Sequence, residues 1–209
     1  MVEKIEGARA TVHGRFVPPP PPRTPKAAAT RRRLLHLAGE MFIEHGYEAV
    51  SLRDIADRAG LTKSAIYGHF RAKGCLLVEV IRWKLAEREH SPEFARTVAD
   101  PDRNVDLMRD PRGRDVRLLE VDAAAAARHD PDVAAGMAEL YAERHLAIRT
   151  AMSQASDPDV MAFVIAALTV GIGMKEAVGV PVPEAGPWHD AITAMLTGAF
   201  PHPPGASGW

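Results

Sequence analysis

Apolar residues recur at three- and four-residue spacing through most of the chain, which is typical of amphipathic helices. The spacing predicts a first helix that begins at Pro25 or Lys26 and ends at His45, because Gly46 follows as a stop signal. Later helices are expected over residues 73–89, 115–128, 131–155, 157–178 and 187–200. Prolines interrupt residues 90–114, where only short helices are expected. No alternating strand pattern competes, so the sequence predicts an all-α protein.

The pattern is most specific over residues 50–70, which predict two short helices with almost no loop between them. Ser51 is the expected N-cap of the first helix, and Asp54 three residues later completes a capping box. Gly60 tolerates the left-handed conformation that a tight turn requires, and Thr62 caps the second helix. Two capped helices this close must cross steeply, as they do in a helix-turn-helix.

The second of these helices is expected to expose a polar face, since Ile66 and Phe70 fall on its inward side. The outward and flanking positions hold Thr62, Lys63, Ser64, Tyr67 and His69. Side chains of these types reach phosphates and base edges, and no acidic residue lies among them. The pattern therefore favours a DNA-reading helix. The alternative is a helix pair of similar shape that contacts only protein.

Charge divides the chain in the same place. The formal net charge is -1, but residues 1–84 hold 15 Lys and Arg against 8 Asp and Glu, while residues 85–209 hold 11 against 19. The basic half contains the expected helix-turn-helix, which favours nucleic acid as its partner. The single cysteine, Cys75, excludes an internal disulfide, and with no signal-peptide pattern it predicts a cytoplasmic location.

The segment from about Thr30 to Trp83 resembles the DNA-binding domain of TetR-family transcriptional regulators. The resemblance rests on Phe42 with the turn His45-Gly46-Tyr47, on the runs from Ser51 to Ala56 and from Ser64 to Phe70 with Ala59-Gly60 between them, and on Lys73. It implies a homodimeric helical repressor whose larger C-terminal domain binds a small-molecule effector and thereby controls affinity for a double-stranded DNA operator. It also implies phosphate contacts from Ser51, Tyr67, His69 and Lys73, and groove contacts from Arg53, Thr62, Lys63 and Ser64.

One position departs from the family pattern. The lysine and acidic pair that usually opens the fourth helix reads Lys73-Gly74-Cys75 here. Glycine is about 1 kcal/mol less favourable than alanine inside a helix. We therefore expect this helix, which links the two halves of the chain, to start late or to fray.

The composition predicts four parts: a disordered proline-rich arm over residues 1–24, a DNA-binding domain over 25–84, an effector-binding and dimerisation domain over 85–202, and a flexible tail over 203–209. Two interpretations of the arm are open. It is either an extension without a role, or a basic arm whose residues Arg23, Lys26 and Arg31 to Arg33 lie along the DNA.

Residues 160–174 are apolar on nearly every side of the expected helix, which must then be covered all round. At 15 residues the stretch is too short to span a bilayer, so no membrane partner is expected. We expect this helix and the last one to form a four-helix interface with a second subunit; the alternative is a helix inside the core of one subunit. The expected interface residues are Phe163, Ala167, Leu168, Gly171, Ile192 and Met195.

The resemblance implies an effector pocket in the C-terminal domain. Its candidate lining residues, each of a type that more often belongs to plain core, are Met108, Leu118, Phe163, Met174 and Trp188. The nine histidines show no metal-ligand spacing, and no nucleophile motif is present, so neither a metal, a cofactor nor an enzyme activity is expected. The sequence favours a repressor. The alternatives are an activator or ligand-independent regulator, and a small-molecule-binding protein or enzyme with a vestigial helix-turn-helix.

Overall fold

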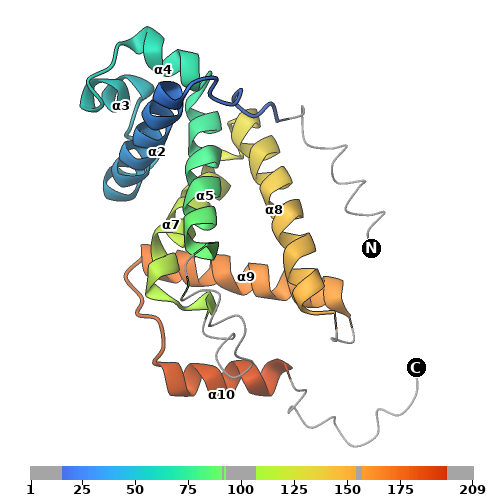
Figure 1. Cartoon of the computed structure of the whole chain (residues 1–209). Coiled ribbons are helices and arrows are strands. Elements are labelled where there is room, and N and C mark those ends of the chain that lie inside the picture. Colours follow the sequence, from blue (N-terminus) through green and yellow to red (C-terminus); the bar gives the residue numbers. More distant parts are fainter. Residues whose placement is uncertain (1–15, 91, 93–106, 154–156, 197–209) are drawn as a thin grey trace, which may run out of the picture.

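The computed structural model describes residues 16–90, 92, 107–153 and 157–196. Within these ranges every regular element is a helix and no strand occurs, so the all-α prediction is confirmed. In the labels of Figure 1 the helices are α2 (Pro25–His45), α3 (Leu52–Arg58), α4 (Lys63–His69), α5 (Lys73–Glu89), the 3-10 turn η2 (Pro111–Gly113), α7 (Arg114–Ala126), α8 (Pro131–Ala151), α9 (Pro158–Ala177) and α10 (Ala185–Leu196). Most of the proline-broken segment lies outside the described residues.

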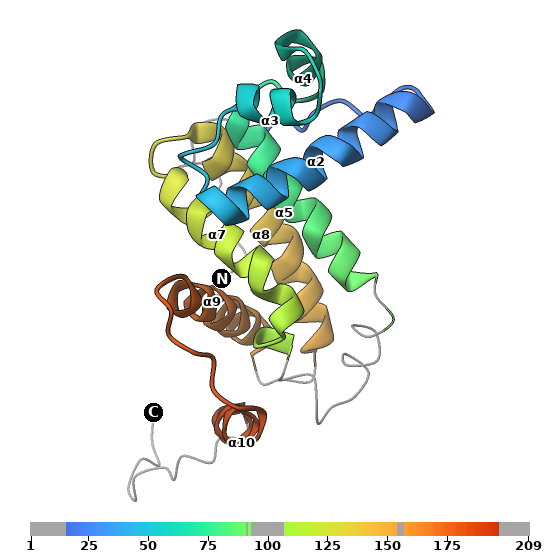
Figure 2. The ribbon, with the colours of Figure 1, turned by 90° about the vertical axis from the view of Figure 1, so that its left-hand side faces the viewer.

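The short helices α3 and α4 lie beside α2 at one end of the molecule, and α10 lies at the other end (Figures 1 and 2). Helix α5 leaves this end and packs against α2, α7 and α8, while α9 crosses beneath and packs against α7 and α8. The expected domain boundary after residue 84 falls inside α5. A change in the position of α5 would therefore affect both α2 in the DNA-binding half and α7 and α8 in the C-terminal half.

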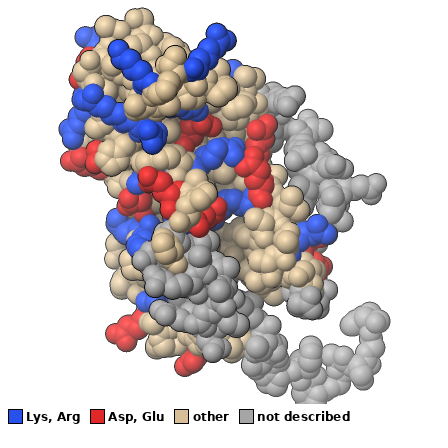
Figure 3. All heavy atoms as spheres, in the orientation of Figure 1, with Lys and Arg blue, Asp and Glu red and all other residues tan. Residues whose placement is uncertain are grey.

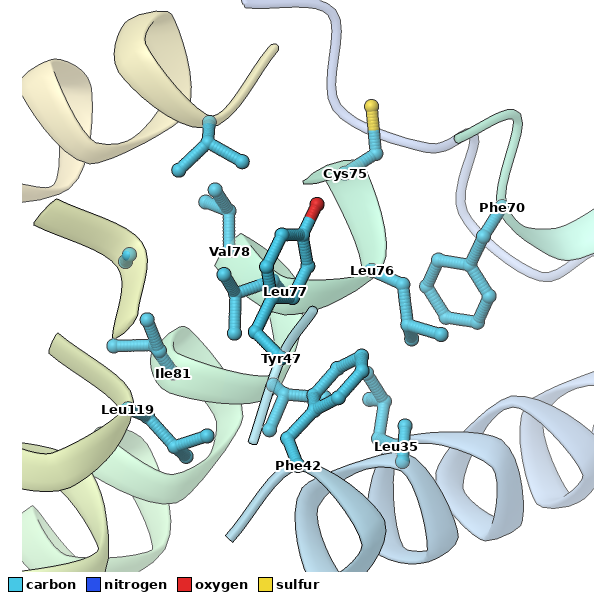
Figure 4. Packing of buried hydrophobic residues seen from close by; sticks show 14 of the residues in the cluster. Leu35, Phe42, Tyr47, Phe70, Cys75, Leu76, Leu77, Val78, Ile81 and Leu119 are labelled. Atoms are coloured by element: carbon cyan, nitrogen blue, oxygen red, sulfur yellow. The ribbon is translucent and has the colours of Figure 1, made fainter. Parts of the chain in front are cut away.

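The core is continuous around α5. Leu76, Leu77 and Ile81 of this helix have no exposed surface. Figure 4 shows Phe42 and Tyr47 on one side of them and Leu119 of α7 on another. These residues belong to one buried cluster, so the helix-turn-helix and the helices behind it share their packing.

The expected ends of α2 and α5 are confirmed. Thr24 caps α2 through its side chain, Pro25 opens the helix, and Gly46 ends it at a φ of 80°. The expectation that Gly74 would delay or fray α5 is wrong, because the helix starts at Lys73. A Cβ on Gly74 would lie 2.6 Å from Asp130 Oδ2, so the glycine is needed for the close approach of α8.

The end of the expected disordered arm takes part in the fold. Residues 16–24 are described, and the side chain of Phe16 is only 2% exposed. Sequence composition suggested a solvated polyproline segment, since the partners of Phe16 are far away along the chain. Residues 1–15 and the tail after residue 196 lie outside the described residues.

Helix α9 differs most from its expected surroundings. Only Ala162, Ile172 and Gly173 are buried in it, whereas Phe163 is 68% and Met174 59% exposed. At 20 residues the helix is also longer than the apolar stretch of 15 residues on which the expectation rested. It contains an 18-residue window with a mean hydropathy of 1.7, so by length and composition alone it could cross a membrane. One face of α9 is thus left uncovered by the described residues of the single chain.

Candidate nucleic-acid interface

The first helix of the helix-turn-helix, α3, begins at the expected capping box. The Asp54 amide donates to Ser51 Oγ at 3.2 Å, and the Ser51 amide donates to Asp54 Oδ2 at 2.9 Å. The Ser51 hydroxyl also donates to Asp54 Oδ2 at 2.6 Å, and this bond, followed by the one from the Ser51 amide, lowers the pKa of Asp54. Gly60 takes a φ of 64° in the turn that follows, as predicted. Local signals alone therefore account for the position of α3.

Helix α4 presents the polar face that the sequence predicted. Thr62 caps it by accepting from the Ala65 amide at 3.3 Å, while Ile66 and Phe70 are fully buried beneath it. The exposed residues on this helix and at its cap are Thr62, Lys63, Ser64, Tyr67 and Gly68. Helix α4 thus offers a compact surface with one cation and several hydroxyl groups.

His69 lies at the end of α4 and is half-buried. Burial, and then the neighbouring Arg31 guanidinium, lower the pKa of His69. The imidazole is therefore mostly neutral at pH 7. Its predicted phosphate contact would then be a hydrogen bond from a neutral ring, and protonation of the ring would add a positive charge to that contact.

Five of the eight predicted DNA-contact residues line one groove of about 450 Å³ between the start of α3, the exposed side of α4 and the start of α5. These five are Ser51, Arg53, Lys63, Tyr67 and Lys73. Thr62, Ser64 and His69 do not line this groove, although Thr62 and Ser64 share the exposed surface of α4. The individual DNA contacts stay predictions.

Arg71 also lines this groove and was missed from the sequence. Its Nη2 is paired with Asp132 on α8, and its Nε donates to Cys75 Sγ at 3.2 Å. The available sequence signal was a basic residue two positions after the end of α4. The fold places its guanidinium at the groove and ties it to the C-terminal domain.

Lys73 has a second role that the pattern did not show. Its Nζ donates to the Tyr47 carbonyl at 3.0 Å and lies 4.1 Å from the centre of the Tyr47 ring. Tyr47 in turn reaches the C-terminal domain, because its amide donates to Asp122 at 2.9 Å and its hydroxyl donates to Asp130 at 3.2 Å. Lys73 therefore supports the turn before α3 as well as lining the groove.

The charge of the described surface follows the sequence pattern. On the face shown in Figure 3, Lys and Arg side chains project from the end formed by α2, α3 and α4, whereas Asp and Glu gather mainly around the middle of the molecule. An anionic polymer would meet the basic end first.

The five expected effector-pocket residues do not line one cavity, although Met108 and Trp188 share one cluster. Met108 is buried in a small cluster with Ile172 and Ile192, against which Trp188 packs. Leu118 lines a separate cavity of about 270 Å³ between α2, α7 and the end of α9. Phe163 and Met174 are exposed on α9.

The expected interface residues are divided as well. Four of them lie on α9 and are exposed or half-buried, namely Phe163, Ala167, Leu168 and Gly171. Ile192 of α10 is buried inside the chain, and the side chain of Met195 lies outside the described residues.

Two buried ion pairs in the C-terminal domain were not predicted. Arg117 of α7 forms two hydrogen bonds of 2.7 Å with Glu176 of α9, and its Nη1 donates to the carbonyl groups of Met108 and Asp110. Glu120 pairs through Oε1 with Arg144 of α8. Its buried Oε2 has no hydrogen-bond partner among the described residues.

Burial raises the pKa of Glu120 despite its pairing with Arg144. Arg117 and Glu120 are buried on α7 together with their sequence neighbours Val116 and Leu119, and a charged residue among apolar positions was the only sequence signal for them. No group of three or more His, Cys, Asp or Glu that could hold a metal occurs in the described part of the chain.

Comparison with known proteins identifies the helix-turn-helix. Residues 34–80, from within α2 to within α5, match the sequence model of the bacterial regulatory proteins, tetR family. The chain carries a TetR-family DNA-binding domain. Over 49 residues it is 45% identical to the HTH-type transcriptional repressor KstR2 of Mycolicibacterium smegmatis, a match that covers 23% of this chain and 24% of that repressor. The chain thus matches about a quarter of the length of that curated relative.

The fold likeness extends further than the sequence match. A protein from Rhodococcus sp. described as a TetR-family transcriptional regulator superposes with a TM-score of 0.68 at 17% identity, covering 81% of this chain and 99% of that one. A transcriptional regulator from Saccharomonospora viridis in complex with choline gives a TM-score of 0.56 at 22% identity, over 81% and 96% of the two chains. At these identities the likeness establishes a shared fold.

Proposed function

We propose that the protein is a homodimeric transcriptional repressor that binds a palindromic DNA operator through α4 and is released by a small-molecule effector. The observation that carries this proposal is the groove in which Ser51, Arg53, Lys63, Tyr67 and Lys73 meet beside the exposed face of a TetR-family recognition helix. The KstR2 repressor shares this domain, but so does the transcriptional activator FasR of Mycolicibacterium smegmatis, so the direction of control is the part of the proposal that a reporter assay of the upstream DNA must test. Two such helices would read half-sites about 34 Å apart.

DNA binding is tested by anisotropy titration on DNA upstream of the protein's own gene, over a range of salt concentrations. Lys63→Ala should weaken binding. A loss of preference for the upstream DNA over random DNA is expected for the groove contact that the resemblance implies, whereas a plot of log affinity against log salt flatter by about one unit would mean that the ammonium contacts a phosphate. Lys175→Ala is the matched control, because this exposed lysine lies on α9, away from the groove. Wild-type protein that binds the upstream DNA no better than random DNA would contradict the proposal.

The uncovered side of α9 supports the homodimer. Its exposed apolar residues recur at helical spacing along one stripe, namely Val160, Phe163, Met174 and Val178, with Ala167 and Gly171 between them. Large apolar surfaces of this kind mark interfaces in soluble proteins. A second copy of the chain would cover the stripe with the same stripe, as a twofold axis requires.

Light scattering after gel filtration tests the dimer. Phe163→Glu should convert a dimer to a monomer, because it places a charge at the centre of an apolar interface. Leu146→Glu is the control, since Leu146 is 58% exposed on α8 rather than on the stripe. A wild-type monomer at micromolar concentration would contradict the dimer.

The contacts of α9 with the rest of the chain favour a cytoplasmic protein over a membrane protein. Helix α9 packs against α7 and α8, and Glu176 near its end is held by the buried Arg117. A helix that spans a bilayer would not need these polar contacts to a water-soluble domain. We therefore assign the apolar face of α9 to a second subunit.

The effector is assigned to the helices behind α5. The Saccharomonospora viridis regulator, which has the same fold, binds choline. That complex supports the proposal of a small-molecule site among the corresponding helices of this chain. An effector that shifts α5 needs a coupling free energy of only about 1 to 3 kcal/mol to change DNA affinity several-fold to about a hundredfold. Screening compounds for release of the bound upstream DNA tests this, and binding that no compound changes would favour a ligand-independent regulator.

A further inference from the structure

The segment before α2 is anchored in the C-terminal domain by Phe16. The ring meets Val78 of α5 and Gly136 of α8, because a Cβ built on Gly136 would come within 2.9 Å of Phe16 Cδ2 and 2.8 Å of Val78 Cγ2. Phe16 belongs to the buried cluster that surrounds α5. Its neighbour Val17, by contrast, is 54% exposed. Gly136 therefore provides space in α8 that an aromatic ring from the N-terminal segment fills.

Arg31 of α2 holds the middle of the same segment. Its Nη1 donates to the Pro20 carbonyl at 3.0 Å, and its Nη2 forms a 2.6 Å ion pair with Glu79 of α5. The guanidinium also lies 5.2 Å from the centre of the Phe70 ring, at the end of the recognition helix. One side chain thus joins the N-terminal segment, α5 and α4.

Five consecutive prolines, Pro18 to Pro22, limit the slack in the connection from Phe16 to α2. Proline fixes φ near −65°, and a residue before proline is held to extended conformations. Figure 1 shows the segment crossing from the start of α8, over α5, to the start of α2. A stiff segment fixed at Phe16 and at Pro20 restricts how far α2 can swing away from α8.

We propose that residues 16–24 form a strap that positions the DNA-binding domain against the C-terminal domain, with Phe16 and Arg31 as its positioning residues. The inference rests on the proposed DNA-binding function. A released strap would let the DNA-binding domain sample more orientations, and only some of them would fit the two half-sites. Apparent affinity falls in proportion to the competent fraction.

The strap makes a different prediction from a basic arm that touches DNA. A positioning residue changes affinity without changing the number of phosphates neutralised, so the salt slope stays the same. An arm that contacts phosphate through Arg23 or Lys26 changes the slope when its path is altered. Salt dependence therefore separates the two roles.

The experiment compares full-length Phe16→Ala with the adjacent control Val17→Ala. Phe16→Ala should raise the dissociation constant for the upstream DNA about three- to tenfold at every salt concentration, with a parallel slope, and Val17→Ala should match wild type. Amide hydrogen exchange in the first turns of α2 should become faster in Phe16→Ala alone. If Phe16→Ala matched wild type in both measurements, or flattened the salt slope, the strap would be refuted.

A second variant protects the test against a simple loss of folding. Leu119→Ala removes a buried side chain of α7 that is only 1% exposed and lies outside the strap contacts, so it should lower stability but leave the dissociation constant and the exchange at the start of α2 unchanged. If Leu119→Ala reproduced both effects of Phe16→Ala, those effects would come from general destabilisation and the strap would be refuted. If wild-type protein fails to bind the DNA, the proposed function fails, but the exchange measurements still decide whether the strap is anchored.

Discussion

The two ends of the molecule are stabilised by different kinds of contact. In the DNA-binding domain, α3 and α4 start at caps formed by Ser51 with Asp54 and by Thr62, all within three residues of the helices they fix. In the C-terminal domain, the pair between Arg117 and Glu176 joins positions 59 residues apart. The comparison shows that the two short helices of the reading surface begin at local caps, whereas α7 and α9 of the C-terminal domain are joined by a buried long-range ion pair.

The largest expected effect is at the buried ion pair. Arg117→Ala leaves Glu176 buried without its cation and removes the donor to two carbonyl groups, so we expect a loss of about 3 to 5 kcal/mol of unfolding free energy. Urea denaturation measures it. The exposed pair of Arg53 with Asp57, at 3.7 Å, is the counterpart in the DNA-binding domain, and Arg53→Ala should change stability far less.

Replacing both members of the buried pair gives its control. Arg117→Met with Glu176→Leu should recover most of the lost stability, because two apolar side chains leave no unpaired charge. If Arg117→Ala cost no more than Arg53→Ala, the distinction between local and long-range support would not hold.

The next effect is at the junction of the two domains. Gly74→Ala improves helix propensity by about 1 kcal/mol, but the new Cβ would lie 2.6 Å from Asp130 Oδ2. Asp130 cannot move aside easily, because it caps α8 through two amides and accepts the Tyr47 hydroxyl. Overpacking of this kind costs about 1 to 3 kcal/mol, so we expect a net loss of stability.

Gly68→Ala is the matched control for that substitution. Gly68 lies in α4 with no atom within 4 Å of the added Cβ, so thermal denaturation should show a small gain. Destabilisation by both variants would place the effect of Gly74 in the helix itself rather than at its contact with α8.

These contrasts explain what could be predicted from the sequence. The ends of α2, α3 and α5 follow from residues within one turn of them, such as Gly46 at a φ of 80°. The anchoring of Phe16 depends on Gly136 of α8, and a propensity argument at Gly74 failed because a distant aspartate decides the fit. The groove could be anticipated where family motifs mark its residues, whereas Arg71 and the buried Glu120 depend on tertiary contacts that no local pattern encodes.

Ser51 separates capping from DNA contact within the locally specified domain. Ser51→Ala should lose about 1 kcal/mol of stability, because α3 loses its cap, and should also weaken DNA binding. Ser51→Asn keeps a capping oxygen and a donor for Asp54 Oδ2, which the Ser51 hydroxyl contacts at 2.6 Å, but replaces the hydroxyl at the groove with a larger amide, so stability should be retained while DNA affinity falls. Calorimetry and anisotropy titration measure the two effects. Equal DNA affinity in Ser51→Asn and wild type would place Ser51 away from the phosphates.

The smallest expected effect is the pH dependence at His69. Burial and Arg31 lower the pKa of its imidazole in the free protein, whereas a phosphate beside it would raise that pKa in the complex. The complex would then bind more protons than its parts, so DNA affinity should rise as pH falls from 8 to 6. The change should be small, because only one imidazole in each DNA-binding domain takes up a proton at this position.

His69→Gln keeps a hydrogen-bond donor but cannot be protonated, so it should flatten this pH dependence while leaving affinity at pH 8 nearly unchanged. Anisotropy titrations at constant ionic strength measure both variants. If His69→Gln kept the full pH dependence, the proton would be taken up elsewhere. The half-buried imidazole would then support the packing of α4 against Arg31 rather than contact DNA.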